Sequence, residues 1–360
     1  NKQKPVIRTI LRSSVYQLKY MDHVPDSAVC NEAVKLAGKK GFVNLKGFVN
    51  GVLRNISRNP DMVSYPDPSN EIACLSVRYS LPMWMVEKWI SVYGKETVEK
   101  MGKAFLEERP VTVRRNTAVV SKEEFEKELE KDGVVFRRHL VLPYAYELTN
   151  YDYLAGLLAF QKGYFYIQDI SSMQVAEWAE PKEGDYVIDV CAAPGGKAIH
   201  LAEKLSGTGY VEARDLTEYK VALIEENIER SGLDNIEAVC QDATINDEAS
   251  YEKADILIAD LPCSGLGILG KKPDLKSKMT VEMAKGLADL QRQILTVVHN
   301  YVKPGGKLLY STCTINREEN EDNTAWFVEN FPEFEKIREK QMLPGSDMGD
   351  GFYIAEFRKQ

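Results

Sequence analysis

The sequence has 360 residues, 44% of them hydrophobic, and a formal net charge of −8. This length exceeds one average domain, and the composition suffices for two or three domains with buried cores. No run of about 18 apolar residues occurs, so no membrane span is predicted, and the negative charge alone argues against a nucleic-acid-binding protein.

The charge is distributed unevenly along the chain. Residues 1–60 contain eleven Lys or Arg and three Asp or Glu, a balance of +8. Residues 61–360 contain 35 basic and 51 acidic residues, a balance of −16. This asymmetry predicts a basic module joined to an acidic one.

The six cysteines form no Cys-x-x-Cys pair and have no histidine nearby at metal-binding spacing. This pattern argues against a metal site and against a disulfide framework, and it indicates a reducing cytoplasm. The first residue is Asn1 rather than Met, and residues 1–20 lack the order of a signal peptide. We therefore expect a fragment of a longer soluble protein, with a monomer as the default state.

Residues 1–65 are predicted to form an all-helical domain. Apolar residues recur at helical spacing in three stripes, within residues 7–18, 29–37 and 48–56, and basic residues occupy the other faces. A solvated helical bundle and an RNA-contacting surface are about equally compatible with this pattern. Arg54 and Arg58, one turn apart, are the pair we would test for RNA contact.

Residues 66–150 are predicted to hold linker helices and a small α/β module of RRM or ferredoxin-like type. Three prolines within residues 60–70 mark a linker, and Pro82 divides a helix pair between residues 76 and 93. Extended runs at 110–117 and 134–142 flank a helix at 122–131. The module has a dense basic cluster that is a weaker candidate for RNA contact: Arg114, Arg115, Arg137 and Arg138.

Residues 151–360 are predicted to form an α/β catalytic domain with a doubly wound, mostly parallel sheet. From Tyr186 onward, five apolar strands alternate with helical segments, as in βαβ units. The run at 352–357, after a Pro-Gly turn, could add an edge hairpin strand.

Acidic and small residues follow the strands of this domain, at the edge where open α/β sheets bind ligands. The first strand ends at Asp189 and leads into Cys191-Ala-Ala-Pro-Gly-Gly-Lys197, a turn that lets backbone approach a ligand at a helix N-terminus. This turn is neither a dinucleotide fingerprint nor a Walker loop. Asp215, at the end of the second strand, is placed to bind a ribose diol, and Asp242 ends the third strand, where an adenine could lie.

Two cysteines follow the next two strands. Asp260-Leu-Pro-Cys263 comes after one apolar run, and Ser311-Thr-Cys313 comes after another, fifty residues later. Because both runs should end at one edge of one sheet, the two thiols could share a pocket. Cys30, Cys74 and Cys240 are expected to be inert packing residues.

The motifs DVCAAPGGK, DLPCSGLG and YSTCTINREEN together resemble the S-adenosylmethionine-dependent RNA cytosine-5 methyltransferases of the Nol1/Nop2/Sun family. Residues 1–60 resemble the later part of a NusB-like domain, the attachment of the bacterial Sun, Fmu or RsmB branch that methylates small-subunit ribosomal RNA. The resemblance covers nearly the whole chain and implies a Rossmann-like methyltransferase domain. The segment between Phe334 and Met342 looks short for the family.

The resemblance implies a role for each residue of the catalytic motifs. Cys313 would be the nucleophile that adds to C6 of cytosine, and Cys263 would assist release of the product. Asp260 would bind the N3/N4 edge of the base, and Lys197 would support the site electrostatically. Pro262 would hold the Pro-Cys turn in place.

The resemblance also implies S-adenosyl-L-methionine as cofactor and 16S ribosomal RNA as partner, with the target cytosine unpaired or flipped out. The residues that would surround the cofactor are Cys191, Ala192, Ala193, Pro194, Gly195, Gly196, Lys197, Asp215, Lys220, Asp242 and Asp260.

Three alternatives remain open from the sequence. The same chemistry could act on another RNA such as tRNA. In a DNA cytosine-5 methyltransferase, the nucleophile would be Cys263 in the Pro-Cys turn. A non-catalytic ribosome-assembly or antitermination factor would use only the helical and Arg-rich modules to bind RNA, and failure to bind S-adenosylmethionine would favour it.

Overall fold

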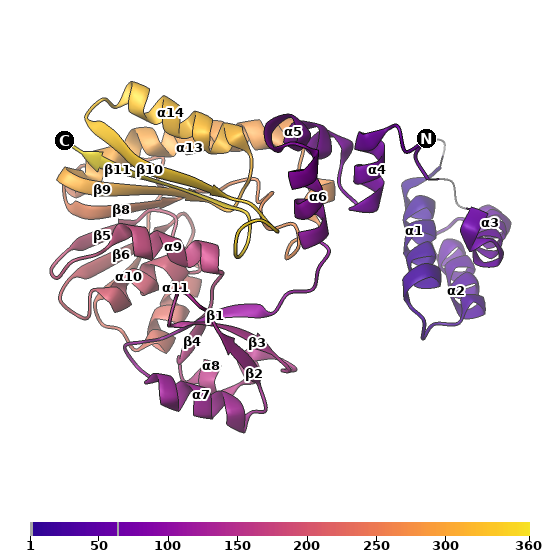
Figure 1. The fold of residues 1–360 in the computed structure, drawn as a ribbon, viewed down its shortest axis with the longest axis horizontal. Coiled ribbons are helices and arrows are strands. Elements are labelled where there is room, and N and C mark those ends of the chain that lie inside the picture. The colour runs from indigo at the N-terminus through magenta and orange to yellow at the C-terminus, as the bar shows by residue number, and fades with distance from the viewer. Residues whose placement is uncertain (1–2, 63–64) are drawn as a thin grey trace. The chain divides into compact units, whose positions relative to one another are not determined.

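The computed structural model describes residues 3–62 and 65–360 (Figure 1). The chain divides into two compact units, residues 1–77 and residues 78–360. The expected domain boundaries near residues 65 and 150 stay predictions.

The first unit is helical, as its apolar stripes predict. Helices α1 (Pro5–Tyr20), α2 (Asp26–Lys39) and α3 (Lys46–Arg58) pack around one core, and α4 (Glu71–Arg78) follows. Short 3-10 turns lie at η1 (Val43–Leu45) and η2 (Pro60–Met62). The buried core residues are those of the three stripes: Ile7, Ile10, Leu11, Cys30, Ala33, Ala37, Val49 and Leu53.

The second unit begins with α5 (Met83–Tyr93) and α6 (Lys95–Ala104), which are separated by Gly94. Gly94 has φ +78°, a conformation that glycine adopts without strain, and so lets the chain turn between the helices. Trp89 is buried and packs against Phe105, with ring centroids 6.2 Å apart. This tryptophan therefore serves packing rather than base stacking.

A four-stranded antiparallel sheet follows, with strand order β2-β3-β1-β4. Its strands are β1 (Val111–Arg115), β2 (Val135–Arg138), β3 (Ala145–Thr149) and β4 (Phe165–Ile167), and it is accompanied by α7 (Lys122–Lys131), η3 (Leu154–Gly156) and α8 (Leu158–Gln161). The sequence pattern predicts β1, β2 and α7 but neither β3 nor β4. Strand β4 lies beyond residue 150, so this sheet draws on a longer stretch of chain than expected.

The large sheet has seven strands in the order β10-β11-β9-β8-β5-β6-β7. Strands β5 (Tyr186–Asp189), β6 (Tyr210–Asp215), β7 (Ile236–Cys240), β8 (Ala254–Asp260) and β9 (Val302–Thr312) are parallel. Strand β11 (Phe352–Lys359) pairs antiparallel with β9, and strand β10 (Phe334–Met342) pairs antiparallel with β11. The predicted doubly wound, mostly parallel sheet is confirmed, but the edge assignment of 352–357 is wrong, because β11 lies between β9 and β10.

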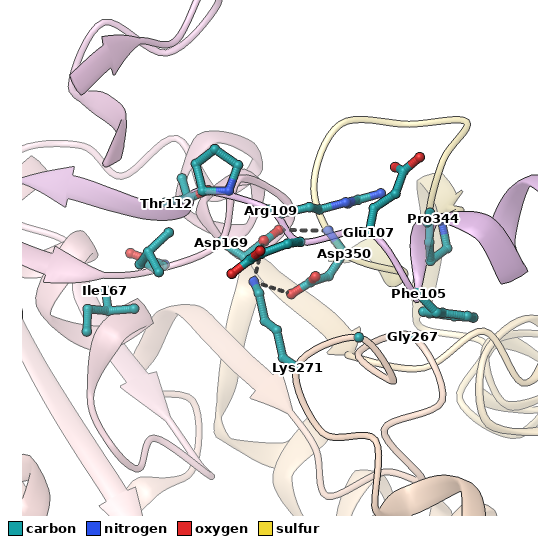
Figure 2. A pocket seen from close by; sticks show the side chains of 16 residues that line it. Phe105, Glu107, Arg109, Thr112, Ile167, Asp169, Gly267, Lys271, Pro344 and Asp350 are labelled. Carbon is teal, nitrogen blue, oxygen red and sulfur yellow. Dashed lines mark hydrogen bonds and ion pairs between the residues drawn. The ribbon is translucent and has the colours of Figure 1, made fainter. Parts of the chain in front are cut away.

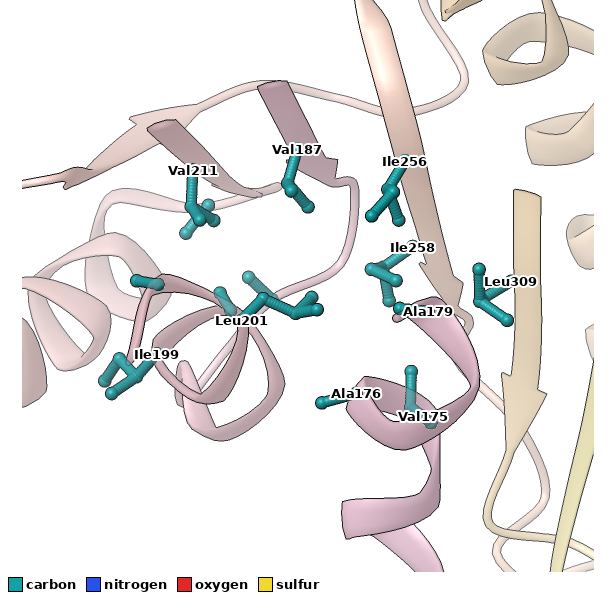
Figure 3. Close-up of a cluster of buried hydrophobic side chains, with 14 of the residues drawn as sticks. Val175, Ala176, Ala179, Val187, Ile199, Leu201, Val211, Ile256, Ile258 and Leu309 are labelled. Carbon is teal, nitrogen blue, oxygen red and sulfur yellow. The ribbon is translucent and has the colours of Figure 1, made fainter. Parts of the chain in front are cut away.

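Helices cover both faces of this sheet (Figure 1). Helices α9 (Ile170–Ala179), α10 (Gly196–Lys204) and α11 (Glu218–Ser231) pack on one face, where Val187, Ile256 and Ile258 point (Figure 3). Helices α13 (Val281–Val298) and α14 (Glu321–Asn330) pack on the other, against Ile188 and Leu257. Burial of both faces explains why these strands read as continuous apolar runs.

Short elements complete the second unit: η4 (Glu248–Ser250), α12 (Leu275–Lys278), η5 (His299–Tyr301) and η6 (Arg317–Glu319). Within residues 3–62 and 65–360, no helix combines the length and the apolar character that crossing a bilayer requires.

Candidate active site

The two cysteine loops leave neighbouring parallel strands. In the register of β8 and β9, Asp260 lies opposite Ser311, so Cys263 and Cys313 emerge at the same edge of the sheet. Their Sγ atoms are 3.3 Å apart, and both side chains are half-buried. The structure thus brings together the two thiols that the motifs single out.

The two thiols have opposite acidities. The hydrogen bond between the two thiols lowers the pKa of Cys313, and nearby Lys197 and Lys272 lower it further, although burial and Asp260 oppose this. The same hydrogen bond and burial raise the pKa of Cys263 well above its ordinary value. A thiolate is the reactive form of cysteine, so these shifts favour the reactive form at Cys313 over that at Cys263.

A charged pair lies beside the thiols. Lys197, in the first turn of α10, donates to Asp260 Oδ2 at 2.7 Å, and the Ser311 hydroxyl donates to Asp260 Oδ1 at 2.6 Å. The Lys197 ammonium also lies over the Phe352 ring, 5.4 Å from its centroid. Asp260 is therefore held in one orientation from two sides.

The strand-to-helix turn after β5 lies at the same edge of the sheet. Gly195 has φ +103°, which favours glycine, and its N–H donates to Ala192 O at 2.6 Å. Asn227 of α11 donates to Pro194 O at 2.9 Å and holds the turn against that helix. An added Cβ at Gly196 would meet nothing within 4 Å, so the turn keeps open space on that side.

Asp215, at the end of β6, is tied to this turn. Its Oδ2 accepts from Ala193 N at 3.0 Å, and its Oδ1 accepts from Leu216 N at 2.7 Å and from Lys220 Nζ at 2.9 Å. The carboxylate is buried, while the Lys220 side chain is about half exposed. A buried carboxylate at this position suits the binding of a diol.

Asp189 and Cys191 lie among these acids. Burial, together with the charge of Asp260, raises the pKa of Asp189 to about 7. Burial also raises the pKa of Cys191 strongly, with Asp189 and Asp215 adding to the effect. Burial therefore favours the neutral forms of Asp189 and Cys191, next to the carboxyl groups of Asp215 and Asp260 at this edge of the sheet.

Asp242 lies two residues beyond β7, and its side chain forms hydrogen bonds within the turn that it begins. Its Oδ1 accepts from Thr244 N at 2.8 Å and from Thr244 Oγ1 at 2.7 Å. The side chain is half-buried. The structure places it at the correct edge of the sheet, in the turn-forming arrangement that aspartate commonly adopts.

A buried polar network behind the cysteines was not assigned from the sequence. Its centre is Glu319 of η6, which accepts from Ser264, Gln291 and Asn316. The Tyr310 hydroxyl lies within hydrogen-bonding distance of the Glu319 carbonyl and of Gln291 Oε1. The run Arg317-Glu-Glu-Asn320 was noted as part of a motif, but nothing in its composition distinguishes the buried carboxylate from its exposed neighbour.

A separate pocket of about 500 Å³ adjoins the Cys263 loop (Figure 2). Lys271 bridges Asp169 and Asp350 there, with Nζ 2.7 Å from an oxygen of each carboxylate. Burial and the charge of Asp169 raise the pKa of Asp350 to about 6. Gly267, in the wall of this pocket, donates its N–H to Cys313 O at 3.1 Å.

The basic cluster of the small sheet is divided in the structure. Arg114 is fully buried and pairs with Glu203 of α10 at 2.9 Å, so it cannot face RNA. Arg137 and Arg138 stay largely exposed while they pair with Glu147 and Glu126. RNA contact by these two residues stays a prediction. Over the described part of the chain, no group of three or more His, Cys, Asp or Glu side chains could hold a metal ion.

Profiles of known families match three parts of the chain. The family described as "16S rRNA methyltransferase RsmB/F" matches residues 176–358, the NusB family matches residues 1–58, and the RsmF/B-like ferredoxin-like domain matches residues 81–151.

Individual relatives cover the chain almost entirely. The "Probable ribosomal RNA small subunit methyltransferase B" of Bacillus subtilis is 36% identical over 100% of this chain and 84% of its own length. The "Ribosomal RNA small subunit methyltransferase B" of Vibrio cholerae is 30% identical over 99% of this chain and 82% of its own length.

Solved structures agree with these matches. The crystal structure of PH0851 has a TM-score of 0.85 at 28% identity and covers 99% of this chain and 83% of that chain. NSun6 from Pyrococcus horikoshii, solved with SFG, has a TM-score of 0.68 at 25% identity and covers 76% of this chain and 97% of that chain.

Proposed function

The chain belongs to the RsmB/F family of 16S rRNA methyltransferases, and we propose that it transfers a methyl group from S-adenosylmethionine to C5 of one cytosine in 16S ribosomal RNA. The observation that carries the C5 chemistry is the thiol pair, with Cys263 Sγ 3.3 Å from Cys313 Sγ and the Lys197–Asp260 pair beside it.

The thiol pair supports covalent catalysis because C5 of cytosine is a weak nucleophile. In the proposed reaction the Cys313 thiolate forms a bond to C6, and the C5–C6 π electrons become available at C5. S-adenosylmethionine would supply an electrophilic methyl group to C5 and would leave as S-adenosylhomocysteine. The C5 proton then passes to solvent water, the electrons of the C5–H bond restore the C5–C6 double bond, and the Cys313–C6 bond breaks to return the Cys313 thiolate. Cys263, hydrogen-bonded to Cys313, assists this release.

Asp260 and Lys197 are assigned to the pyrimidine ring. Asp260 hydrogen-bonds the N3/N4 edge, where charge develops as the thiolate adds. Lys197 neutralises Asp260 and stabilises the thiolate electrostatically. Both faces of C5–C6 must be reached, so the cytosine has to be unpaired or turned out of its stack.

The cofactor is assigned to the adjacent acidic edge of the sheet. Asp215 would accept hydrogen bonds from the ribose hydroxyls, with Lys220 beside it. Asp242 would lie by the adenine. The open turn from Cys191 to Lys197 would hold the methionine and ribose portion.

The test is transfer of labelled methyl to unmethylated small-subunit ribosomal RNA, with the product base mapped. Wild type should label one cytosine at C5, and Cys313→Ala should abolish labelling. Cys263→Ala should instead accumulate a covalent protein–RNA adduct on a denaturing gel, while Cys240→Ala, at an exposed position, should behave as wild type.

Three results would contradict the proposal. Adduct formation through Cys263 in the Cys313→Ala variant would reverse the roles of the thiols. Labelling of another RNA such as tRNA, with none on ribosomal RNA, would change the substrate class. Absence of cofactor binding would point to a non-catalytic assembly factor.

A further inference from the structure

Glu319 is a fully buried carboxylate directly behind the two cysteine loops. Its Oε2 accepts from Ser264 N at 2.8 Å and from Gln291 Nε2 at 3.2 Å. Its Oε1 accepts from Asn316 Nδ2 at 2.8 Å and from the Ser264 hydroxyl. All four of these groups donate to Glu319. A carboxylate can accept from all of them, whereas the N–H₂ group of a neutral amide could not accept a hydrogen bond.

These contacts connect the residues that directly follow each cysteine. Ser264 follows Cys263, and its hydroxyl also lies 2.8 Å from the hydroxyl of Thr314, which follows Cys313. Gln291 of α13, besides contacting Glu319, donates to Pro262 O at 2.9 Å, on the other side of Cys263. The loop of Cys263 is therefore fixed to Glu319 from both sides, and the loop of Cys313 is joined to it through Asn316 and through the hydroxyl pair of Thr314 and Ser264.

The charges around the thiol pair are arranged asymmetrically. Among the charged groups that affect Cys313, Lys197 and Lys272 favour its thiolate and Asp260 opposes it. Among those that affect Cys263, the Glu319 carboxylate disfavours ionisation. A negative charge on the Cys263 side and cations on the Cys313 side together favour a proton on Cys263 over one on Cys313.

We propose that Glu319 is a positioning residue that holds Cys263 and Cys313 within hydrogen-bonding distance and assigns the proton to Cys263, so that Cys313 is the nucleophile. The role of Cys313 as nucleophile rests on the proposed function. Which of the two thiols carries the proton, however, is a property of the free protein.

Burial raises the pKa of Glu319, whereas the hydrogen bonds from Ser264, Asn316 and Gln291 lower it. Substitution by Gln would remove the charge and turn an N–H₂ group toward donors, leaving at least one buried donor without an acceptor. The neighbouring Glu318 provides a matched control, because its carboxylate is half-exposed and pairs with Lys88 at 3.0 Å.

The experiment compares wild type, Glu319→Gln and Glu318→Gln by iodoacetamide labelling of the free protein, with the labelled peptides quantified separately for Cys263 and Cys313. Wild type and Glu318→Gln should label at Cys313. Glu319→Gln should divide the label between both thiols. In the methyl-transfer assay its kcat should fall about tenfold or more. Its KM for RNA and its affinity for the cofactor should stay within about twofold of the wild-type values.

Ser264→Ala is a second variant, which loses the hydroxyl bridge but keeps the charge of Glu319. It should retain labelling at Cys313 while kcat falls. This result would distinguish the effect of the distance between the two thiols from the effect of the Glu319 charge. Unchanged labelling and kcat in Glu319→Gln would overturn the proposal, as would labelling of Cys263 in wild type. A wild type that labels at Cys313 but methylates no cytosine would refute the proposed function and leave the allocation of the proton supported.

Discussion

Lys197 of α10 and Asp260 of β8 form an ion pair of 2.7 Å in which both side chains are largely buried. Burial works to lower the pKa of Lys197, but the charge and hydrogen bond of Asp260 outweigh it, and the pKa is raised. The ammonium group therefore stays charged beside Cys313 at physiological pH.

Removing this charge should change the acidity of Cys313. In Lys197→Met the thiolate loses a stabilising cation and faces an unneutralised Asp260, so the pKa of Cys313 should rise. A rise of about one unit reduces the thiolate fraction at neutral pH about tenfold. The rate of iodoacetamide labelling against pH measures this shift. Lys204→Met, on the same helix but paired with Glu177, should leave the midpoint unchanged.

Asp215→Asn should weaken cofactor binding. The carboxylate is buried and keeps acceptor capacity beyond its bonds to Ala193, Leu216 and Lys220. A hydrogen bond to a charged group contributes about 1.5–3 kcal/mol, so the dissociation constant for S-adenosylmethionine should increase about tenfold to a hundredfold. Calorimetric titration measures it, with Glu218→Gln on the surface of α11 as control. Equal affinities for wild type and Asp215→Asn would remove Asp215 from the cofactor site.

The parallel strands of the large sheet could be predicted from the sequence, because burial of both faces gives continuous apolar runs. The ends of these strands could also be located, because the catalytic motifs begin directly after them. Strand β10 could not be predicted, because its sequence FEKIREKQM carries charges along an exposed edge of the sheet. The place of β11 depends on pairing with β9, which is distant in sequence. Likewise, Arg114 and Glu319 are buried while their neighbours Arg115 and Glu318 are more exposed, a difference set by tertiary packing alone.

Arg54 and Arg58 are exposed on α3, and Arg54 Nε donates to Asn50 Oδ1 at 3.0 Å. If they contact phosphates, the double variant Arg54→Ala/Arg58→Ala should bind RNA more weakly and with a shallower salt dependence. Each lost contact should reduce the slope of log K against log salt by about 0.7–0.9. Filter binding at several salt concentrations tests this. Lys35→Ala is the control, because the Lys35 ammonium group pairs with Glu32 at 2.6 Å in wild type. An unchanged slope in the double variant would exclude Arg54 and Arg58 as phosphate contacts.

The buried pair of Arg114 and Glu203 should control the stability of the second unit. Arg114→Met leaves a buried carboxylate without its cation and should lower the free energy of unfolding by about 3–5 kcal/mol at pH 8. Adding Glu203→Gln should recover a large part of that loss. Urea unfolding of the two single variants and the double variant measures the coupling, and strictly additive losses would show that the pair is not coupled.

The same pair has a predictable pH dependence. Burial raises the pKa of Glu203 to about 7 from an ordinary 4.5, so folding favours its protonated form. The stability that this group contributes is complete below pH 4.5 and is lost as the pH rises through 7. Glu203→Gln should therefore show a weaker fall in unfolding free energy between pH 5 and 8 than wild type, and parallel curves would contradict the assignment.

Strand β9, which leads directly into Cys313, receives its second neighbour only from β11. During synthesis, the ribosome therefore makes the thiol-bearing strand well before the segment that completes its pairing. A nascent chain halted before Phe352 would expose a long apolar edge, which is prone to pair with other chains. Premature termination should thus yield an aggregating product rather than a weak enzyme.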